Sequence, residues 1–327
     1  MKCEKCGKNF RTLQALQDHF KTVHPGERLI VPKSTTSRNL LVIVIIVILV
    51  IGSIVGYIVF LQVSQSKTTT TTTTTQSGIL GTEISSALYQ NLSGVSTSTL
   101  ASVGSGQGVS GLTHISGSPL TSNGKPEILY IGGDFCPYCA VQRWSIVIAL
   151  AKFGTFSGLQ YMQSSPTDTP ASISTFTFYN TTYTSQYVSF SSVEEYDIAR
   201  NPLQTPTAAQ TALFDKYDTQ GTIPFLDIGN QYAITTSQVA PSTIQNMNWT
   251  QIAGQLDNPD SAIAKAVDGA ANTLITAICN IDGGNPASVC GESFAKLPIM
   301  IPTDNLGFQL ILGAPSAQYA KISEPPL

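Results

Sequence analysis

Apolar residues are gathered in one long run and in several short segments along the 327 residues of the chain. The long run covers residues 40–61, carries no charge and opens with twelve consecutive aliphatic side chains. A helix rises about 1.5 Å per residue, so a helix of this length crosses a bilayer core of about 30 Å. We predict a transmembrane helix, because the run is longer than a signal segment and follows a long N-terminal stretch.

The short apolar segments beyond residue 78 alternate between the period of two typical of strands and the period of a helix. Helices are expected at residues 83–92, 141–153, 206–217, 249–256 and 261–278. Strands are expected at residues 125–131, 159–163, 175–179 and 187–190, followed by one that starts at Pro224. This order predicts an α/β domain whose folded core begins near residue 125.

The motif Cys136-Pro137-Tyr138-Cys139 lies where the first of these strands gives way to a helix. The N-terminus of a helix presents unpaired N–H groups and its positive dipole end to Cys136, which favours the thiolate. We therefore predict that Cys136 is the attacking thiolate and that Cys139 resolves the mixed disulfide. The placement is that of a thioredoxin-type dithiol. Zinc bound by the four cysteines beyond the apolar run is the competing interpretation, and the position of the motif argues against it.

Pro224 begins a short strand flanked by turns. In thioredoxin-like folds the corresponding proline is cis and packs against the dithiol, so we expect a cis Ile223–Pro224 bond and count Pro224 as a candidate catalytic residue. Pro224 lies 85 residues beyond Cys139, farther than a minimal thioredoxin requires. Residues 165–201 are therefore expected to form an inserted β segment that shapes a partner-binding face.

The first 28 residues carry the spacing Cys3-x2-Cys6-x12-His19-x4-His24. Two thiolates and two imidazoles form a tetrahedral Zn²⁺ site, and so small a unit cannot bury a sufficient core without the metal. The pattern predicts a small ββα Cys2His2 zinc finger with structural zinc. A lone finger reads only about three base pairs and neutralises few phosphates, so we favour a protein partner or a structural cap over binding to nucleic acid.

Charge is distributed asymmetrically about the apolar run. Before it lie eight basic and three acidic residues, and after it nine basic and seventeen acidic ones. The positive-inside rule places the N-terminus in the cytoplasm and the dithiol outside, where disulfides persist. Charged residues make up only 11% of the chain, against about 25% in an ordinary domain. Three explanations of this low value stay open: a chain composition that is simply poor in charged residues, a coat of glycans, and an acidic exterior in which carboxylates would be protonated.

Eight consecutive threonines at residues 68–75 predict an extended stalk. The expected organisation is a finger over 1–28, a basic juxtamembrane segment over 29–39, the membrane helix over 40–61, a Thr-rich linker over 62–78, a Ser/Gly-rich lead-in over 79–124 and a thioredoxin-like domain over 125–327. Candidate N-glycosylation sites in the outward part are Asn91, Asn180 and Asn248.

The run of residues 125–144, KPEILYIGGDFCPYCAVQRW, resembles a family of thioredoxin-like proteins of unassigned function that occur in archaea and in some actinobacteria. The resemblance continues through residues 153–156, 175–179 and 279–290. It implies a thioredoxin-like fold and a dithiol, and it brings no established substrate. The finger and the membrane anchor are additions outside this resemblance.

Cys279 and Cys290 form a second outward pair, separated by the turn sequence Gly283-Gly284-Asn285-Pro286. The sequence leaves two interpretations open, a structural disulfide or a relay that exchanges with Cys136 and Cys139.

Together these patterns predict a membrane-anchored thiol-disulfide oxidoreductase acting on secreted or surface protein thiols. The alternative is a non-enzymatic surface binding or sensory protein whose finger recruits a cytoplasmic partner.

Overall fold

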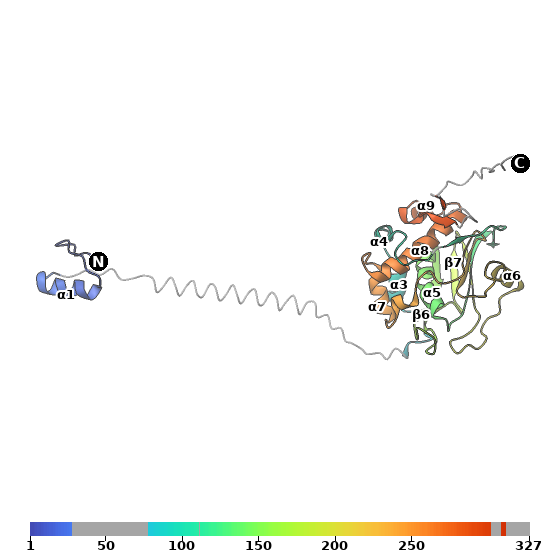
Figure 1. Ribbon diagram of the computed structural model, residues 1–327, viewed down its shortest axis with the longest axis horizontal. Coiled ribbons are helices and arrows are strands. Elements are labelled where there is room, and N and C mark those ends of the chain that lie inside the picture. The colour runs from blue at the N-terminus through green and yellow to red at the C-terminus, as the bar shows by residue number, and fades with distance from the viewer. Residues whose placement is uncertain (28–77, 111, 302–308, 312–327) are drawn as a thin grey trace. The chain divides into compact units, whose positions relative to one another are not determined.

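The computed structural model describes residues 1–27, 78–110, 112–301 and 309–311, and the chain divides into two compact units (Figure 1). The first unit is Met1–Thr72 and the second is Thr73–Leu327. The predicted juxtamembrane segment, the predicted transmembrane helix over 40–61 and all but the last residue of the predicted Thr-rich linker lie outside the described residues.

Residues 1–27, the described part of the N-terminal unit, contain a turn and a helix. An antiparallel bridge joins Lys2 to Asn9, and helix α1 spans Leu13–Val23. Thr12 caps the helix, because its side chain accepts a hydrogen bond from the backbone N–H of Ala15 at 3.2 Å. The buried core consists of Cys3, Leu16 and Phe20, with Phe10 packed against them. So small a core cannot hold a fold by burial alone.

The second unit is organised around a mixed sheet. Its strands run in the order β1 (Thr113–His114), β10 (Tyr232–Ile234), β9 (Phe225–Ile228), β3 (Lys125–Gly132) and β2 (Thr121–Ser122), and β8 (Ser189–Glu194) also pairs with β3. Strand β8 is parallel to β3, whereas β9 is antiparallel to it. Ile131 near the end of β3 thus lies between Val193 and Phe225.

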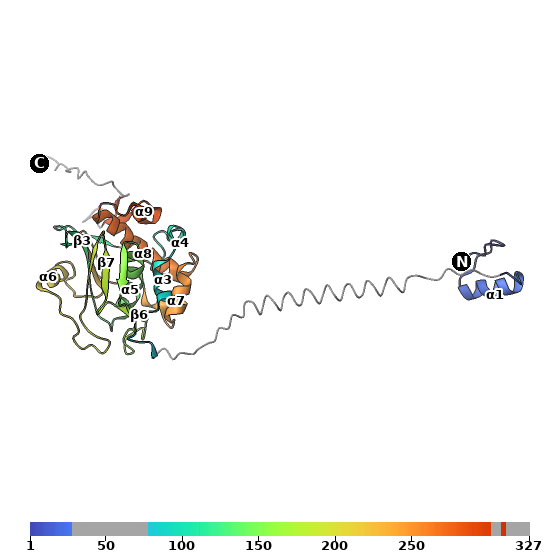
Figure 2. The ribbon, with the colours of Figure 1, turned by 180° about the vertical axis from the view of Figure 1, so that it is seen from behind.

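Helices cover both faces of this sheet, because the side chains of β3 alternate between them. Ile128 and Tyr130 belong to the main core with helix α5 (Pro137–Leu150) and helix α8 (Ala262–Ile281). Leu129 and Ile131 point to the other face, where Phe214 of helix α6 (Ala208–Tyr217) packs on them. Figures 1 and 2 show α8 and α6 on opposite sides of the sheet.

The folded core begins before residue 125, the start that the sequence predicted. Helices α3 (Ser86–Ser93) and α4 (Thr97–Val103) lie within the expected lead-in, and Leu88, Leu92 and Leu100 are buried in the main core. The abundant serines misled the prediction, because Ser85 and Ser96 are helix caps rather than linker residues. The helix expected at 83–92 is confirmed as α3.

Two small antiparallel pairs form the insertion. Strand β4 (Gly154–Ser157) pairs with β7 (Thr182–Ser185), and β5 (Gln160–Gln163) pairs with β6 (Ser174–Thr177). The strand expected at residues 159–163 is confirmed as β5, but it pairs with β6 outside the main sheet, where β8 lies beside β3. The added β structure therefore starts at Gly154 instead of residue 165, since strand propensity does not reveal which strand a segment pairs with.

The predicted closing helices are confirmed as α7 (Trp249–Leu256) and α8. Beyond them come helix α9 (Ala287–Cys290) and the 3-10 turn η3 (Ser293–Ala295). Strands β11 (Ile299–Ile301) and β12 (Gln309–Ile311) then form an antiparallel pair. Another 3-10 turn, η2 (Pro241–Ile244), precedes α7. Within the described ranges α8 alone is long and apolar enough to cross a membrane, and 83% of its most apolar window is buried inside the fold, as in a core helix.

Candidate functional site

The dithiol lies at the start of α5, directly beyond the end of β3. Cys136 is the N-cap residue, and its Sγ accepts a hydrogen bond from the backbone N–H of Cys139 at 3.2 Å. Pro137 occupies the first turn, where a missing N–H costs nothing. Both cysteines carry free thiols, and Cys136 is 5% exposed whereas Cys139 is fully buried. The sulfur of Cys136 is therefore the one within reach of a substrate.

The two thiols differ in acidity. The hydrogen bond from the Cys139 thiol holds the pKa of Cys136 below its ordinary value, and the backbone N–H of Cys139 and the charge of Arg143 act in the same direction. Burial raises the pKa of Cys139 well above its ordinary value. This asymmetry is the one that a nucleophile and its resolving partner require.

The turn before β9 lies against the dithiol. The Ile223–Pro224 peptide bond is cis, and the thiol of Cys136 lies 3.7 Å from the carbonyl oxygen of Ile223, to which it donates. The antiparallel pairing of β3 with β9 accounts for this meeting, because it puts the end of β3 beside the start of β9. The structure thus brings the Pro224 turn to Cys136, although the two are far apart in sequence.

A buried ion pair lies beneath the dithiol. Arg143 sits one helical turn after Cys139, and its Nε and Nη2 donate to the two carboxylate oxygens of Glu194 at 3.0 and 2.7 Å. Both side chains are fully buried. Nη2 of Arg143 also donates to the carbonyl of Gly133 at 3.0 Å. Burial raises the pKa of Glu194 to about 7, although the charge of Arg143 opposes this shift.

Sequence reasoning missed Glu194, although one signal for it exists. Arg143 lies in a helix that is buried almost all round, and a buried guanidinium requires a partner. Asp134 is a weaker partner, with 3.5 Å between its Oδ1 and Nη2 of Arg143, and burial raises the pKa of Asp134. Trp144 is a core residue whose Nε1 donates to the carbonyl of Ser174 at 2.9 Å.

The N-terminal unit brings together Cys3, Cys6, His19 and His24, whose potential ligand atoms all lie within 4.8 Å of one another. The Sγ of Cys6 is 3.2 Å from Nε2 of His19. Nε2 of His24 is buried and has no hydrogen-bond partner among the described residues, which suits a ligand to a metal ion. This set of two sulfur and two nitrogen donors fits Zn²⁺ and its tetrahedral geometry.

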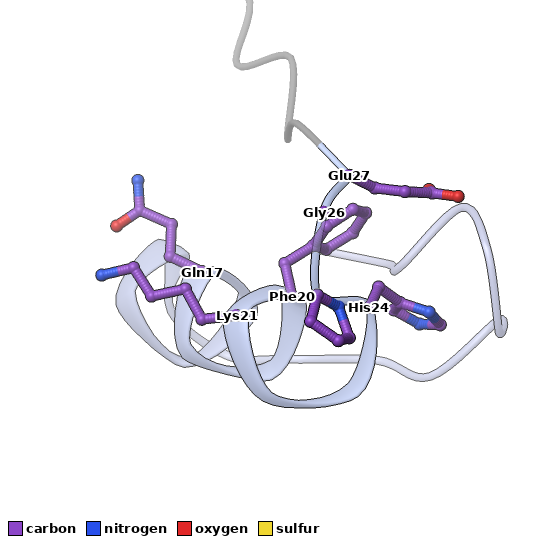
Figure 3. A pocket seen from close by; sticks show the side chains of 7 residues that line it. Gln17, Phe20, Lys21, His24, Gly26 and Glu27 are labelled. Atoms are coloured by element: carbon purple, nitrogen blue, oxygen red, sulfur yellow. The ribbon is translucent and has the colours of Figure 1, made fainter.

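A hollow of about 520 Å³ lies beside this cluster, lined by Gln17, Phe20, Lys21, His24, Pro25, Gly26 and Glu27 (Figure 3). Its lining combines the apolar ring of Phe20 with the two opposite charges of Lys21 and Glu27. The hollow belongs to the N-terminal unit alone.

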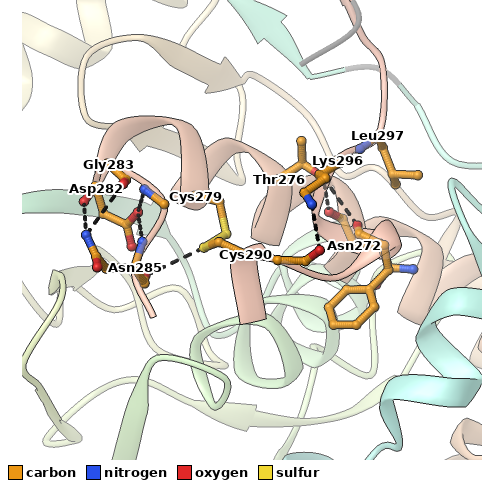
Figure 4. Close-up of a disulfide and its surroundings, with 12 residues drawn as sticks. Asn272, Thr276, Cys279, Asp282, Gly283, Asn285, Cys290, Lys296 and Leu297 are labelled. Atoms are coloured by element: carbon orange, nitrogen blue, oxygen red, sulfur yellow. Dashed lines mark hydrogen bonds between the residues drawn. A yellow bond between two sulfur atoms is a disulfide. The ribbon is translucent and has the colours of Figure 1, made fainter. Parts of the chain in front are cut away.

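Cys279 and Cys290 are joined in a disulfide with 5.5 Å between their Cα atoms (Figure 4). The disulfide ties the end of α8 to α9. Next to it, Nδ2 of Asn280 donates to the hydroxyl of Tyr232 at 3.1 Å, and Tyr232 pairs with Ile228 at the far end of β9. The disulfide and the dithiol therefore lie at opposite ends of β9, a placement that suits a structural crosslink better than a relay.

The three candidate glycosylation sites differ in their surroundings. Asn91 and Asn180 are exposed. Asn248 is the N-cap of α7, where its side chain accepts a hydrogen bond from the backbone N–H of Gln251 at 2.9 Å. The amide of Asn248 is thus already engaged in the fold.

The fold and the site define an α/β protein with a mixed central sheet and a reduced cysteine pair compatible with a redox role. The chain belongs to the DUF929 family, a domain of unknown function, whose family model matches residues 112–280. No curated protein matches the chain, and neither does any solved structure.

Proposed function

We propose that the second unit is a thioredoxin-like thiol-disulfide oxidoreductase. The observation that carries the proposal is the asymmetric dithiol: the pKa of Cys136 is lowered at the start of a helix, and that of Cys139 is raised by burial. A nucleophilic thiolate beside a protonated resolving thiol is the starting state for disulfide exchange.

The topology supports a thioredoxin-like assignment. Around β3 the chain follows the order strand, helix, strand, helix, strand, strand, helix that is typical of such folds, through α5, β8, α6, β9, β10 and α8. The two small antiparallel pairs between α5 and β8, together with η2 and α7 between β10 and α8, are additions to that order. The turn with cis Pro224 lies against Cys136, as is expected of a thioredoxin-like fold.

The reaction is a two-electron exchange. The Cys136 thiolate attacks one sulfur of a substrate disulfide, forming a mixed disulfide and releasing the other substrate sulfur as a thiolate. Cys139 then loses its proton and attacks Sγ of Cys136, which releases the second substrate thiolate and leaves a Cys136–Cys139 disulfide. The same steps in reverse oxidise a substrate dithiol. Pro224 shapes the surface against which the substrate sulfur approaches.

We place this unit outside the cell, on a single-pass membrane anchor formed by residues 40–61, with the finger of residues 1–28 in the cytoplasm. The charge asymmetry of the sequence supports this orientation. The disulfide between Cys279 and Cys290 supports it independently, because structural disulfides persist in oxidising compartments. The substrates would then be thiols and disulfides of secreted or surface proteins.

We propose that the N-terminal unit is a structural zinc finger that binds a cytoplasmic protein. Base-reading fingers use the residue before the helix and the third and sixth helical residues. Here these are Thr12, Ala15 and Asp18. Thr12 is occupied as the helix cap, Ala15 has no hydrogen-bonding side chain, and the carboxylate of Asp18 would repel phosphate. This arrangement weighs against nucleic acid as the partner.

The proposal is tested with the full-length protein in detergent and a small disulfide, 2-hydroxyethyl disulfide. Wild type should exchange with it, Cys136→Ser should be inactive, and Cys139→Ser should accumulate the mixed disulfide, which mass spectrometry detects. Wild-type exchange no faster than that of a folded Cys136→Ser variant would reject an enzyme. That result would favour the alternative, a binding or sensory protein that uses the fold as a scaffold.

A further inference from the structure

Residues 195–202 form a loop, here called the tip loop, that continues β8 beyond the end of β3. The backbone N–H of Glu195 donates to the carbonyl of Gly132 at 2.8 Å, and that of Asp134 donates to the carbonyl of Tyr196 at 2.9 Å. A bridge between Tyr196 and Pro202 closes the loop. The tip loop therefore lies along residues 132–134, which lead into Phe135 and Cys136.

The tip loop is fastened across Phe135, the residue immediately before the nucleophile. The guanidinium of Arg200 lies 3.8 Å from the centre of the Phe135 ring. The same group donates to both carboxylate oxygens of Asp168, at 2.6 and 2.8 Å. The ring of Tyr196 meets Phe135 edge-on at 6.2 Å between centroids. These contacts hold an aromatic wall in place beside Cys136.

This wall presents apolar side chains to solvent. The described part of the second unit has four exposed large apolar side chains, and three of them belong to the dithiol motif or the tip loop. Tyr138 is 46% exposed, Tyr196 41% and Ile198 39%, whereas the fourth, Leu80, belongs to neither element. Exposed apolar groups concentrated at a reactive atom indicate a binding surface.

The tip loop offers a ligand no free positive charge. The charge of Arg200 is paired with Asp168. The carboxylate of Asp197 accepts hydrogen bonds from Asn201 and from the backbone N–H of Ala199. Glu195, at the root of the loop, is half-buried. The carboxylates of an anionic small thiol such as glutathione would therefore find no unpaired cation on this loop.

We propose that the tip loop is the substrate-docking element of the enzyme and that its occupant is an extended, unfolded segment of a client protein with apolar residues next to the reacting cysteine. This inference rests on the proposed function. Any substrate sulfur bonded to Cys136 must lie beside Phe135 and the tip loop. Cys136 is only 5% exposed, which admits a slender extended chain more readily than a folded surface.

The experiment uses the full-length protein and two disulfide-linked peptides of equal length and charge. In one, the cysteines are flanked by leucine and phenylalanine, and in the other by serine and glycine. Wild type should prefer the apolar peptide. The variants Tyr196→Ser and Ile198→Ser should together lower kcat/KM for the apolar peptide by on the order of tenfold, as expected for lost burial of two apolar groups. Exchange with 2-hydroxyethyl disulfide, which is too small to lie along the loop, should fall much less than exchange with the apolar peptide.

Leu80→Ser is the matched control, because it removes another exposed apolar side chain of the same unit, and it should leave both peptides unaffected. Equal rates for the two peptides in wild type would overturn docking by the tip loop, and so would an equal loss on the peptide and on 2-hydroxyethyl disulfide. Absent exchange would instead reject the proposed function. In that case docking is measured by equilibrium binding of the apolar peptide with serine in place of cysteine. Tyr196→Ser should raise the Kd for this peptide. An unchanged Kd would overturn docking by the tip loop.

Discussion

Arg143 and Glu194 are 51 positions apart in the sequence and form a bidentate ion pair whose two side chains are fully buried. The pair joins α5 to β8 directly beneath the dithiol. A charge so deeply buried is costly unless its partner remains in place. Arg143 also contributes to the lowered pKa of Cys136, so the pair links the stability of the fold to the acidity of the Cys136 thiol.

Glu194→Leu should destabilise the protein by about 3–5 kcal/mol, because it leaves the guanidinium of Arg143 buried without its main partner. The double variant Arg143→Met/Glu194→Leu should recover most of that loss, since it removes both charges. Chemical denaturation of the single and double variants measures the two effects. A double variant as unstable as the sum of the single ones would show that the residues do not act as a pair.

Replacing Arg143 should also raise the pKa of Cys136, because a positive charge that favours the thiolate is lost. The rate of alkylation by iodoacetamide as a function of pH reports this pKa. In the double variant, which keeps the fold, the midpoint should move to higher pH than in wild type. An unchanged midpoint would mean that the hydrogen bonds from Cys139 and Tyr138, and not the charge of Arg143, favour the thiolate.

The dithiol could be read from the sequence because its determinants are contiguous: a strand, four motif residues and a helix. Glu194 could not, because its partner is far away along the chain. The same distinction explains the errors in the fold. The segment at 159–163 was correctly predicted as a strand, but its pairing with β6 instead of β3 depends on tertiary packing.

The second unit should be more stable in acid than at neutral pH. Burial raises the pKa of Asp268 to about 8 and those of Asp227 and Asp282 to about 6. Each has at least one buried carboxylate oxygen without a hydrogen-bond partner within the described residues. When the pKa of a carboxyl is higher in the folded than in the unfolded protein, the group stabilises the fold fully below its unfolded pKa of about 4. This stabilisation is lost as the pH rises through its folded pKa.

The free energy of unfolding should therefore decrease between about pH 4 and pH 8. Lys152 opposes the shift of Asp268, and Asp257 adds to it. Asp268→Asn should flatten the profile and stabilise the protein at pH 8, whereas Asp260→Asn, at an exposed position, should not. Denaturant unfolding across this pH range is the measurement. A stability that rises toward pH 8 would contradict the prediction. The low content of charged residues, 11%, is compatible with a protein that works at acidic pH, where these carboxyls are protonated.

Removing the second cysteine pair should weaken the fold without affecting exchange. Cys279→Ala/Cys290→Ala opens a loop of 11 positions, and the chain-entropy model assigns such a loop about 3 kcal/mol. Exchange with 2-hydroxyethyl disulfide should continue at the wild-type rate, because the dithiol lies at the other end of β9. A folded double variant that loses turnover would instead establish the relay that the sequence left open.

The N-terminal unit should require one zinc ion per chain to fold. Its core consists of little more than Leu16, Phe20 and the ligand Cys3, so the ion must supply most of the folding free energy. His24→Ala should abolish stoichiometric zinc binding, measured by metal analysis of the purified chain, and should remove the absorption bands that Co²⁺ gives at a tetrahedral sulfur-containing site. His114→Ala is the matched control, since His114 is the third histidine of the chain and lies in the other unit. Exchange at the dithiol should survive either substitution. Zinc retained at full stoichiometry by the His24 variant would place the metal elsewhere, for example at the cysteines of the second unit.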